Sequence, residues 1–413
     1  ENTAFYVNME LFGQMETKMN KTILQLSLAV ITIGIVGTAL AAEKIPEWQK
    51  IVITSKFRSE GAAFGDFNKD GQVDVVYGHI WFEGPDFKTE HQFMEGEDSY
   101  DPESYSNSFV NFVDDINGDG WDDIIICPHP GTDGFWYENP QGKDGMWPVH
   151  ESTIELGNES QAWEDVNGDG DNELIFNRNN WYGYAVPKAD APWDFIAISN
   201  ESPKYQRYFH GNGAGDINGD GRVDLIEMDG WWEQPENVKD VPWTFHEFKF
   251  ADAASNILVA DFNQDGLNDV FTAWHCHQYG LLCWLQKRGA DGSIDFEPVW
   301  IIPTEPEDGS PLKISQLHSM ALGDFNGDGI VDVVTGKRWW AHGSKGDVAP
   351  NDPAILVWFE TKIGDNGTVF FTPHFIDNES GVGTQVMAKD INGDNIPDIL
   401  VGNKRGCFLH LSK

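Results

Sequence analysis

Seven short stretches of the chain carry side-chain oxygens at a spacing that suits calcium. Each follows the pattern Asp-x-Asn-x-Asp-(Gly/Asn)-x-x-(Asp/Glu), with an aliphatic run after it. Oxygens at positions 1, 3 and 5 of such a loop converge on one point, and a carboxylate at position 9 completes the shell. The flanks are typical of strands, which excludes an EF-hand. The predicted Ca²⁺ ligands are Asp66, Asn68, Asp70, Asp74, Asp115, Asn117, Asp119, Asp123, Asp165, Asn167, Asp169, Glu173, Asp216, Asn218, Asp220, Asp224, Asp261, Asn263, Asp265, Asp269, Asp324, Asn326, Asp328, Asp332, Asp390, Asn392, Asp394 and Asp398.

Two histidines form a compact candidate for a second kind of metal site. His275 and His277 are two residues apart, and alternate residues of an extended segment point the same way. Both rings could therefore reach one Zn²⁺ or another divalent cation, with His318 as a third ligand. Between them, Cys276 leaves two alternatives open: a bridge to Cys283 across a hairpin, or a buried free thiol.

A further group of polar and aromatic residues falls in segments that vary between the repeats. A histidine there could abstract a proton α to a carbonyl, and a lysine or arginine could stabilise the resulting enolate. Tryptophans outside the repeated pattern could stack on a sugar ring. The predicted catalytic residues are His129, His318, Lys337, Arg338 and His342, and the predicted substrate-binding residues are His79, Trp232, Trp339, Trp340, Asn403 and Lys404.

The elements that must position these residues are strands in a repeat of 45–66 residues. Each unit contains a short strand, the aspartate loop, an aliphatic strand, a strand with Trp and a fourth strand that often carries His. Four antiparallel strands per unit are typical of a propeller blade. The sequence therefore predicts an all-β fold, a seven-bladed β-propeller with a Ca²⁺-binding loop in each blade.

Closure of the ring is predicted from the two ends of the repeat region. The chain ends after the third strand of the seventh unit, and residues 48–53 match the fourth-strand pattern. An N-terminal outer strand therefore closes the ring, and residues 42–413 form a single domain. The calcium loops lie on one face, and the long insertions at 304–316 and 336–353 lie on the opposite face, where we expect the functional site.

The N-terminal region and the charge bear on location and partners. Residues 1–18 are predicted to be a non-native upstream segment and residues 19–41 a signal peptide; an uncleaved membrane anchor is the alternative. We expect a secreted or periplasmic protein with no stable membrane insertion after cleavage. The net charge of −40, from 67 acidic and 27 basic residues, argues against nucleic acid as a partner.

The repeats resemble the FG-GAP/VCBS propellers, whose calcium-loop blades also occur in integrin α-subunits. Two blocks, 317–343 and 380–406, are similar to the propeller domain of aldos-2-ulose dehydratase-type enzymes. That resemblance implies a metal-assisted dehydration of keto-sugars. The fungal members of that family carry additional cupin domains, for which residues 42–413 leave no room.

These observations predict a secreted lyase that acts by dehydration or β-elimination on an oxidised or acidic sugar, at the face opposite the calcium loops. The expected cofactors are up to seven structural Ca²⁺ ions and a Zn²⁺ or Mg²⁺ at the active face. Small carbohydrates or polysaccharides are the expected partners. Two alternatives stay open: a non-catalytic carbohydrate- or protein-binding propeller similar to lectins and integrins, and a polysaccharide lyase acting on uronic-acid polymers.

Overall fold

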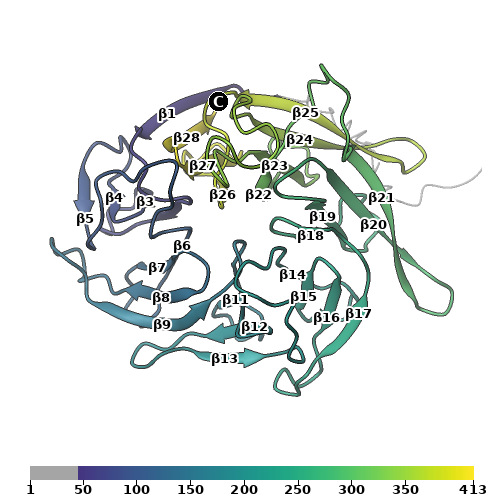
Figure 1. Ribbon diagram of the computed structural model, residues 1–413, viewed down its shortest axis with the longest axis horizontal. Coiled ribbons are helices and arrows are strands. Elements are labelled where there is room, and N and C mark those ends of the chain that lie inside the picture. The colour runs from purple at the N-terminus through teal and green to yellow at the C-terminus, as the bar shows by residue number, and fades with distance from the viewer. Residues whose placement is uncertain (1–44) are drawn as a thin grey trace, which may run out of the picture. The chain divides into compact units, whose positions relative to one another are not determined.

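A computed structural model describes residues 45–413, which form seven four-stranded antiparallel sheets. The predicted segments 1–18 and 19–41 lie outside the described residues. Within residues 45–413 the secondary structure is entirely β, and no helix long and apolar enough to span a membrane occurs in that part of the chain. Seen down its axis, this unit is a ring of blades around a centre (Figure 1).

Each blade runs from an innermost to an outermost strand. The first three blades are β2–β5 (Ala63–Gly65, Asp74–Tyr77, Ile80–Phe82, Glu90–Gln92), β6–β9 (Val110–Asp114, Asp123–Cys127, Thr132–Tyr137, Val149–Leu156) and β10–β13 (Ala162–Glu164, Glu173–Arg178, Trp181–Val186, Asp194–Ala197). The next three are β14–β17 (Gly213–Gly215, Asp224–Glu227, Gly230–Glu233, Thr244–Glu247), β18–β21 (Leu258–Ala260, Asp269–Ala273, Leu281–Arg288, Ile294–Ile302) and β22–β25 (Leu317–Gly323, Asp332–Lys337, Leu356–Ile363, Val369–Asp377).

The seventh blade combines strands from both ends of the described chain. Its inner strands are β26 (Val386–Lys389), β27 (Asp398–Asn403) and β28 (Gly406–Ser412), and its outer strand is β1 (Trp48–Thr54). β1 pairs antiparallel with β28, with Trp48 opposite Ser412 and Val52 opposite Phe408. The outer strand thus covers the hydrogen-bonding edge that β28 would otherwise expose.

Packing within and between blades explains the aliphatic runs of the sequence. The second strands are buried on both faces, as in β3, β7, β19 and β27. Their side chains form hydrophobic clusters that join neighbouring blades, for example Phe359 of β24 with Phe271 of β19. The four cysteines are buried free thiols, so the Cys276–Cys283 bridge is not formed.

The repeated tryptophan and histidine belong to this scaffold. His91 stacks on Trp81 at a ring-centroid distance of 3.9 Å, and its Nε2 lies 3.0 Å from Glu83 Oε2. The same stacking and the same Glu contact recur at His150, His246 and His374. These four histidines hold the outer strands against the third strands.

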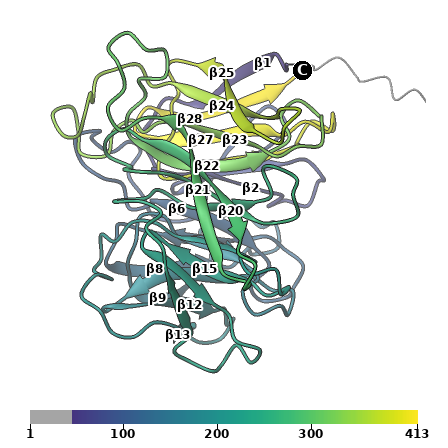
Figure 2. The ribbon, with the colours of Figure 1, turned by 90° about the vertical axis from the view of Figure 1, so that its right-hand side faces the viewer.

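The antiparallel connections divide the loops between two faces, which lie at the two ends of the ring axis (Figure 2). The aspartate loops join first to second strands and lie on one face. The second-to-third loops and the links between blades lie on the other, here called the link face. A channel of about 610 Å³ runs along the axis between the innermost strands, with Ser160, Asn212, Ser319 and Thr384 among its lining residues.

Candidate functional site

The aspartate loops are closed by their own side chains. In the first loop Asp66 Oδ1 and Asn68 Oδ1 both accept the backbone N–H of Asp70, at 3.1 and 3.0 Å. Asp66 Oδ2 accepts the N–H of Gly71, whose φ of 82° lies in the left-handed region that favours Gly, or Asn as at Asn395. The oxygens of positions 1 and 3 therefore converge on one point inside the loop. Such convergence of side-chain oxygens is what a Ca²⁺ site requires.

The position-9 carboxylate anchors each loop to its blade. Asp74 accepts the N–H of Phe67 at 2.9 Å and that of Gly84 at 2.8 Å, which ties the loop to the end of the third strand. Asp123, Asp224, Asp269, Asp332 and Asp398 make the same pair of bonds; Glu173 binds only within its loop. Burial raises the pKa of Asp74 to about 6. Calcium binding by these loops stays a prediction.

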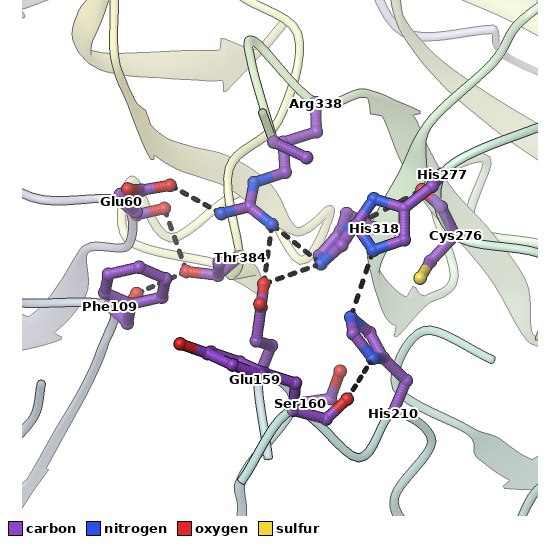
Figure 3. Close-up of polar contacts among 12 residues, drawn as sticks. Glu60, Phe109, Glu159, Ser160, His210, Cys276, His277, His318, Arg338 and Thr384 are labelled. Atoms are coloured by element: carbon purple, nitrogen blue, oxygen red, sulfur yellow. Dashed lines mark hydrogen bonds and ion pairs between the residues drawn. The ribbon is translucent and has the colours of Figure 1, made fainter. Parts of the chain in front are cut away.

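On the link face, one position of the repeat brings unlike residues together around the axis. It lies six residues before the first loop aspartate, where the inner strand begins. The seven residues at this position are Glu60, Phe109, Glu159, His210, Ser255, His318 and Thr384. Phe109, Ser255 and Thr384 carry no ionisable group, and the other four residues do. We call these seven residues the axial ring; Figure 3 shows six of them around a central arginine.

Arg338 fills the middle of the axial ring. Its guanidinium donates to Glu60 Oε2 at 2.6 Å and to Glu159 Oε2 at 2.9 Å, and both side chains of the Arg338–Glu60 pair are only 1% exposed. A third contact, 2.7 Å long, reaches His318 Nε2. Lys404 Nζ lies 3.9 Å from Glu60 Oε1. Burial and the two carboxylates together fix Arg338 as a structural cation rather than one that faces a substrate.

Beside Arg338, three histidines and a cysteine converge from three segments: the link before β14, the loop between β19 and β20, and β22. The ligand atoms of His210, Cys276, His277 and His318 all lie within 4.8 Å of one another. His210 Nε2 and His277 Nε2 are 3.2 Å apart. We call these four residues the axial His/Cys cluster (Figure 3). His318 and Cys276 are fully buried, whereas His210 and His277 are partly exposed.

Hydrogen bonds to backbone carbonyls determine which ring nitrogen of His210 and of His318 carries the proton. His210 Nδ1 donates to the carbonyl of Tyr208 at 2.8 Å, and His318 Nδ1 donates to that of Cys276 at 3.3 Å. Burial lowers the pKa of His210 to about 4 and that of His318 well below its usual value. Both imidazoles are therefore neutral, and the Nε2 of each carries a lone pair.

A second group shares His277. Asp347 Oδ1 lies 2.8 Å from His342 Nδ1 and 3.4 Å from His277 Nδ1, and Asp347 Oδ2 accepts the backbone N–H of His342 at 3.0 Å. The hydrogen bond that His342 donates to Asp347 raises the pKa of His342. Half of the His342 side chain is exposed to solvent, so its Nε2 is open to an incoming molecule.

The structure places His275 beside His277 but outside the cluster. Residues 275–278 form a turn, in which the N–H of Gln278 bonds to the carbonyl of His275 at 3.0 Å. His275 Nδ1 accepts the backbone N–H of His277 at 3.2 Å, and the two ring centroids are 6.1 Å apart. Cys276 and His277 join the cluster, and the binding of one cation by His275 and His277 stays a prediction. His129 is also outside the cluster and packs against the rings of Tyr105, Phe109 and Tyr208.

Three other predicted residues are buried and engaged by the protein. Lys337 is 1% exposed, its Nζ donates to Ser315 Oγ at 3.1 Å, and burial lowers its pKa to about 8. Asn403 donates to the carbonyl of Ser380 at 2.6 Å and its own carbonyl accepts the hydroxyl of Tyr77. Lys404 donates to the carbonyl of Ser104 at 2.7 Å. Their contacts hold loops of the link face together.

The predicted sugar-stacking residues also differ from expectation. Trp232 is 5% exposed and packs in the core against Phe245, so it is not a stacking surface. His79 is 5% exposed in the turn between β3 and β4, where burial lowers its pKa. Trp339 and Trp340 stack on each other at 4.8 Å and are half-buried, and Trp340 Nε1 donates to the carbonyl of Pro350.

Sequence reasoning missed Glu60, Glu159, Cys276 and Asp347 as site residues. A signal for the two glutamates exists: alignment of the seven repeats on their first aspartate places both at the position that His210 and His318 occupy. The position of Asp347 beside His277 has no such signal, because it depends on the path of a long loop.

Comparison with known proteins agrees with this architecture. Residues 115–176 and 261–335 match the FG-GAP-like repeat family. No curated protein sequence matches the chain. A solved Agrocybe aegerita lectin that recognises non-reducing terminal N-acetylglucosamine is 16% identical with a TM-score of 0.47, over 77% of this chain and 80% of that one.

Two other solved structures give similar values. The extracellular domain of a one-component system, BT4673 from B. thetaiotaomicron, is 12% identical with a TM-score of 0.47, over 88% of this chain and 40% of that one. BBS1N, solved in complex with ARL6DN, is 9% identical with a TM-score of 0.48, over 89% and 97% of the two chains. The seven sheets make residues 45–413 a seven-bladed β-propeller, in which residues 115–176 and 261–335 match FG-GAP-like repeats.

Proposed function

We propose that this protein is a carbohydrate lyase whose reaction takes place on the link face, at His342 and the axial His/Cys cluster. The observation that carries the proposal is the His342–Asp347 pair. A half-exposed imidazole whose Nδ1 is held by a buried carboxylate at 2.8 Å has its Nε2 directed outward, as a general base requires. His277, with its ring centroid 4.8 Å from that of His342, brings the cluster within reach of the same substrate.

The chemistry that fits is elimination next to a carbonyl or carboxyl group. His342 Nε2 would take the proton from the α-carbon, and the electron pair of that C–H bond would form a C=C bond as the β C–O bond breaks. The leaving oxygen would recover a proton from the His342 imidazolium and depart as an alcohol or as water. Asp347 would stabilise the imidazolium in between, since its carboxylate contacts Nδ1.

The surroundings favour an acidic or oxidised sugar. Arg207 is exposed and lies against Tyr208, next to His210, and Arg405 stacks on Trp339 at 4.8 Å. These two cations, unlike Arg338, have no carboxylate partner within residues 45–413 among the ion pairs of the structure, so a uronate or a keto-acid could pair with them. Tyr105, His129 and Tyr208 add ring surface for a sugar.

A substrate screen tests the proposal. We expect purified protein to generate the absorbance of a conjugated double bond from 2-keto sugars or from uronate oligomers, which distinguishes dehydration from polysaccharide cleavage. His342→Ala should lower kcat by about 100-fold or more, the range of general-base loss. Asp347→Asn should lower kcat more than it raises KM.

The matched control is His246→Asn, a histidine of the fourth blade that stacks on Trp231 away from the axis. It should retain turnover, after correction for any loss of folded protein measured by thermal unfolding. Equal losses in His246→Asn and His342→Ala would refute a localised site. Saturable sugar binding that His342→Ala weakens, with no new absorbance from any substrate, would replace the lyase by a non-catalytic carbohydrate-binding propeller.

A further inference from the structure

The channel on the ring axis has an apolar wall that the fold leaves half-buried. Its volume is about 610 Å³, within the range of small-molecule sites. Phe112, Trp163, Leu258, Leu322 and Met387 line it, one from each of five blades, and each is half-buried. Apolar surface that faces a channel is stabilised when an apolar molecule covers it and displaces water. The wall therefore suits an apolar ligand.

The channel is closed toward the link face and open toward the aspartate loops. Arg338, Glu60 and His318 fill the axial ring, are at most 1% exposed and do not line the channel. At the other end Glu164, the last residue of β10, lines the channel and is exposed to solvent. A ligand would therefore enter from the side of the aspartate loops, away from His342.

The closed end of the channel carries two polar atoms without hydrogen-bond partners. Ser160 Oγ and Gln161 Oε1 are buried atoms, and the two residues, which line the channel, are 2% and 6% exposed. The other end of the Gln161 amide is engaged, since Nε2 donates to the carbonyls of Gly157 and Asn158 at 3.2 and 2.6 Å. A buried polar atom without a partner lowers the stability of the free protein, and a ligand that bonds to it removes that cost.

The other amides along the channel are satisfied by the protein itself. Asn212, Asn256 and Gln385 each have both ends of the amide in hydrogen bonds. Among the lining residues of the described chain, 45–413, only Ser160 and Gln161 carry buried side-chain polar atoms without a partner. The unpartnered atoms of the channel are therefore concentrated at its closed end.

The charge of the lining decides the class of ligand. Within residues 45–413, Glu164 at the open end is the single charged residue of the lining. A carboxylate or phosphate would meet no cation in the channel, and an ammonium group at the closed end would be buried without a lining carboxylate, so either charge is disfavoured. A hydroxyl group can donate to Gln161 Oε1 and accept from the hydroxyl of Ser160.

We propose that the axial channel binds a neutral amphiphile, an aliphatic alcohol whose hydroxyl group bonds to Ser160 and Gln161. Its apolar chain lies along Trp163, Leu258 and Met387 and extends toward the open end. This site goes beyond the proposed lyase and does not depend on it, because the buried axial ring around Arg338 separates the channel from the link face.

Calorimetric titration of the full chain with a series of alcohols tests the site. We expect 1-hexanol, 1-heptanol and 1-octanol to bind with one molecule per chain, and the affinity to rise by about 4-fold for each added CH₂ group. Octanoate and octylammonium, which have the same chain length but carry a charge, should bind at least about 10-fold more weakly than 1-octanol. Octanol binding should be unchanged in His342→Ala, since that residue lies on the link face.

Two variants test the polar end of the site. Ser160→Ala removes one partner of the hydroxyl group without breaking a hydrogen bond of the free protein, and should lower the affinity for 1-octanol by about 2- to 10-fold. Gln161→Glu adds a negative charge at the closed end, so it should reverse the preference between 1-octanol and octylammonium. Thermal unfolding checks that both variants are folded. Ser55→Ala, at an exposed serine after β1, is the matched control and should bind 1-octanol like the parent protein.

Three results would each overturn the proposal and leave a channel that holds only water. The first is no saturable binding of 1-octanol, or binding of several molecules per chain. The second is an affinity that does not depend on chain length. The third is an equal loss of affinity in Ser160→Ala and Ser55→Ala. Octanoate bound as tightly as 1-octanol would refute the neutral ligand class. None of these results bears on sugar turnover, so the channel site and the lyase fail separately.

Discussion

The two faces of the propeller present opposite solutions to placing charged side chains. On the face of the aspartate loops, here called the loop face, a nine-residue pattern recurs seven times, and six of the loops are tied to their own blade by bonds such as Asp74 to Phe67 and Gly84. On the link face one repeat position holds seven residues of five types, six of which surround Arg338 at the axis (Figure 3). Repetition gives local sites that do not need the ring. Variation at one position gives a single site that exists only in the closed ring.

The energetics of the two regions differ as well. Loop carboxylates at position 5 are exposed and those at position 1 are half-buried, so water screens much of their repulsion. The axial carboxylates of Glu60 and Glu159 are buried, and only Arg338 and its neighbours compensate them. Removal of one charged side chain should therefore lower the free energy of unfolding slightly on the loop face and strongly at the axis.

Deletion of residues 46–55 should have the largest effect. It removes β1, exposes the edge of β28 and opens the ring at the seventh blade. We expect aggregation or loss of the cooperative thermal transition, measured by calorimetry and size-exclusion chromatography. A stable monomer with the thermal midpoint of the parent would show that the ring does not depend on closure by β1.

Arg338→Met should be the most destabilising single substitution among these tests. It leaves Glu60 and Glu159 buried without a counter-charge, which costs about 3–5 kcal/mol of unfolding free energy in denaturant titrations. Lys88→Met is the control, since Lys88 and Asp86 form an exposed, solvent-screened pair whose loss should leave the unfolding free energy nearly unchanged. The triple variant Glu60→Gln, Glu159→Gln, Arg338→Met should recover part of the loss; no recovery would contradict the charge argument.

The buried histidine of the seventh blade should give a pH-dependent stability. His410 is 1% exposed, its Nε2 lies 3.1 Å from Ser380 Oγ, and burial lowers its pKa to about 4, against an opposing effect of Asp377 and a supporting one of Lys50. As the pH falls, the unfolded chain binds a proton at His410 before the folded protein does. The free energy of unfolding is therefore unaffected by His410 titration above about pH 6.5 and falls by about 3 kcal/mol by pH 4.

The measurement compares unfolding free energies of parent protein and His410→Gln between pH 7 and pH 4. The difference between the two proteins should shrink as the pH falls, because only the parent must keep a neutral imidazole buried. A difference that stays constant across this range would show that His410 titrates normally in the folded protein.

A single loop should contribute less. We propose that the loops bind Ca²⁺; saturation of one site at 100 times its Kd would add about 2.7 kcal/mol. Asp328→Ala in the sixth loop should lower the melting temperature with Ca²⁺ present and have little effect after chelation. An equal effect in both conditions would assign Asp328 to loop geometry alone, through the hydrogen bond that its Oδ1 accepts from Ile330.

The sequence by itself determined the repeat, the strands and the blade count. Its loop motif spans nine residues, and its strand signals lie within one unit of 45–66 residues, so short-range backbone chemistry is enough to predict them. The histidine that recurs in the fourth strand belongs to the same repeat, and His91 on Trp81 shows the contact that holds it. Trp48–Thr54 as the outer strand of the last blade also follows from pattern.

Only the tertiary structure decided the site. Arg338 and Glu60 are 278 residues apart in the sequence. Nothing in the sequence near Arg338, which was predicted to contact substrate, indicates that two buried carboxylates neutralise its charge. The turn at His275 and the loop that carries Asp347 to His277 depend on packing between blades. Closure of the ring creates these contacts, because it brings the residues at one repeat position of successive blades next to one another around the axis. The sequence shows which residues occupy that position, and only the fold brings them into contact.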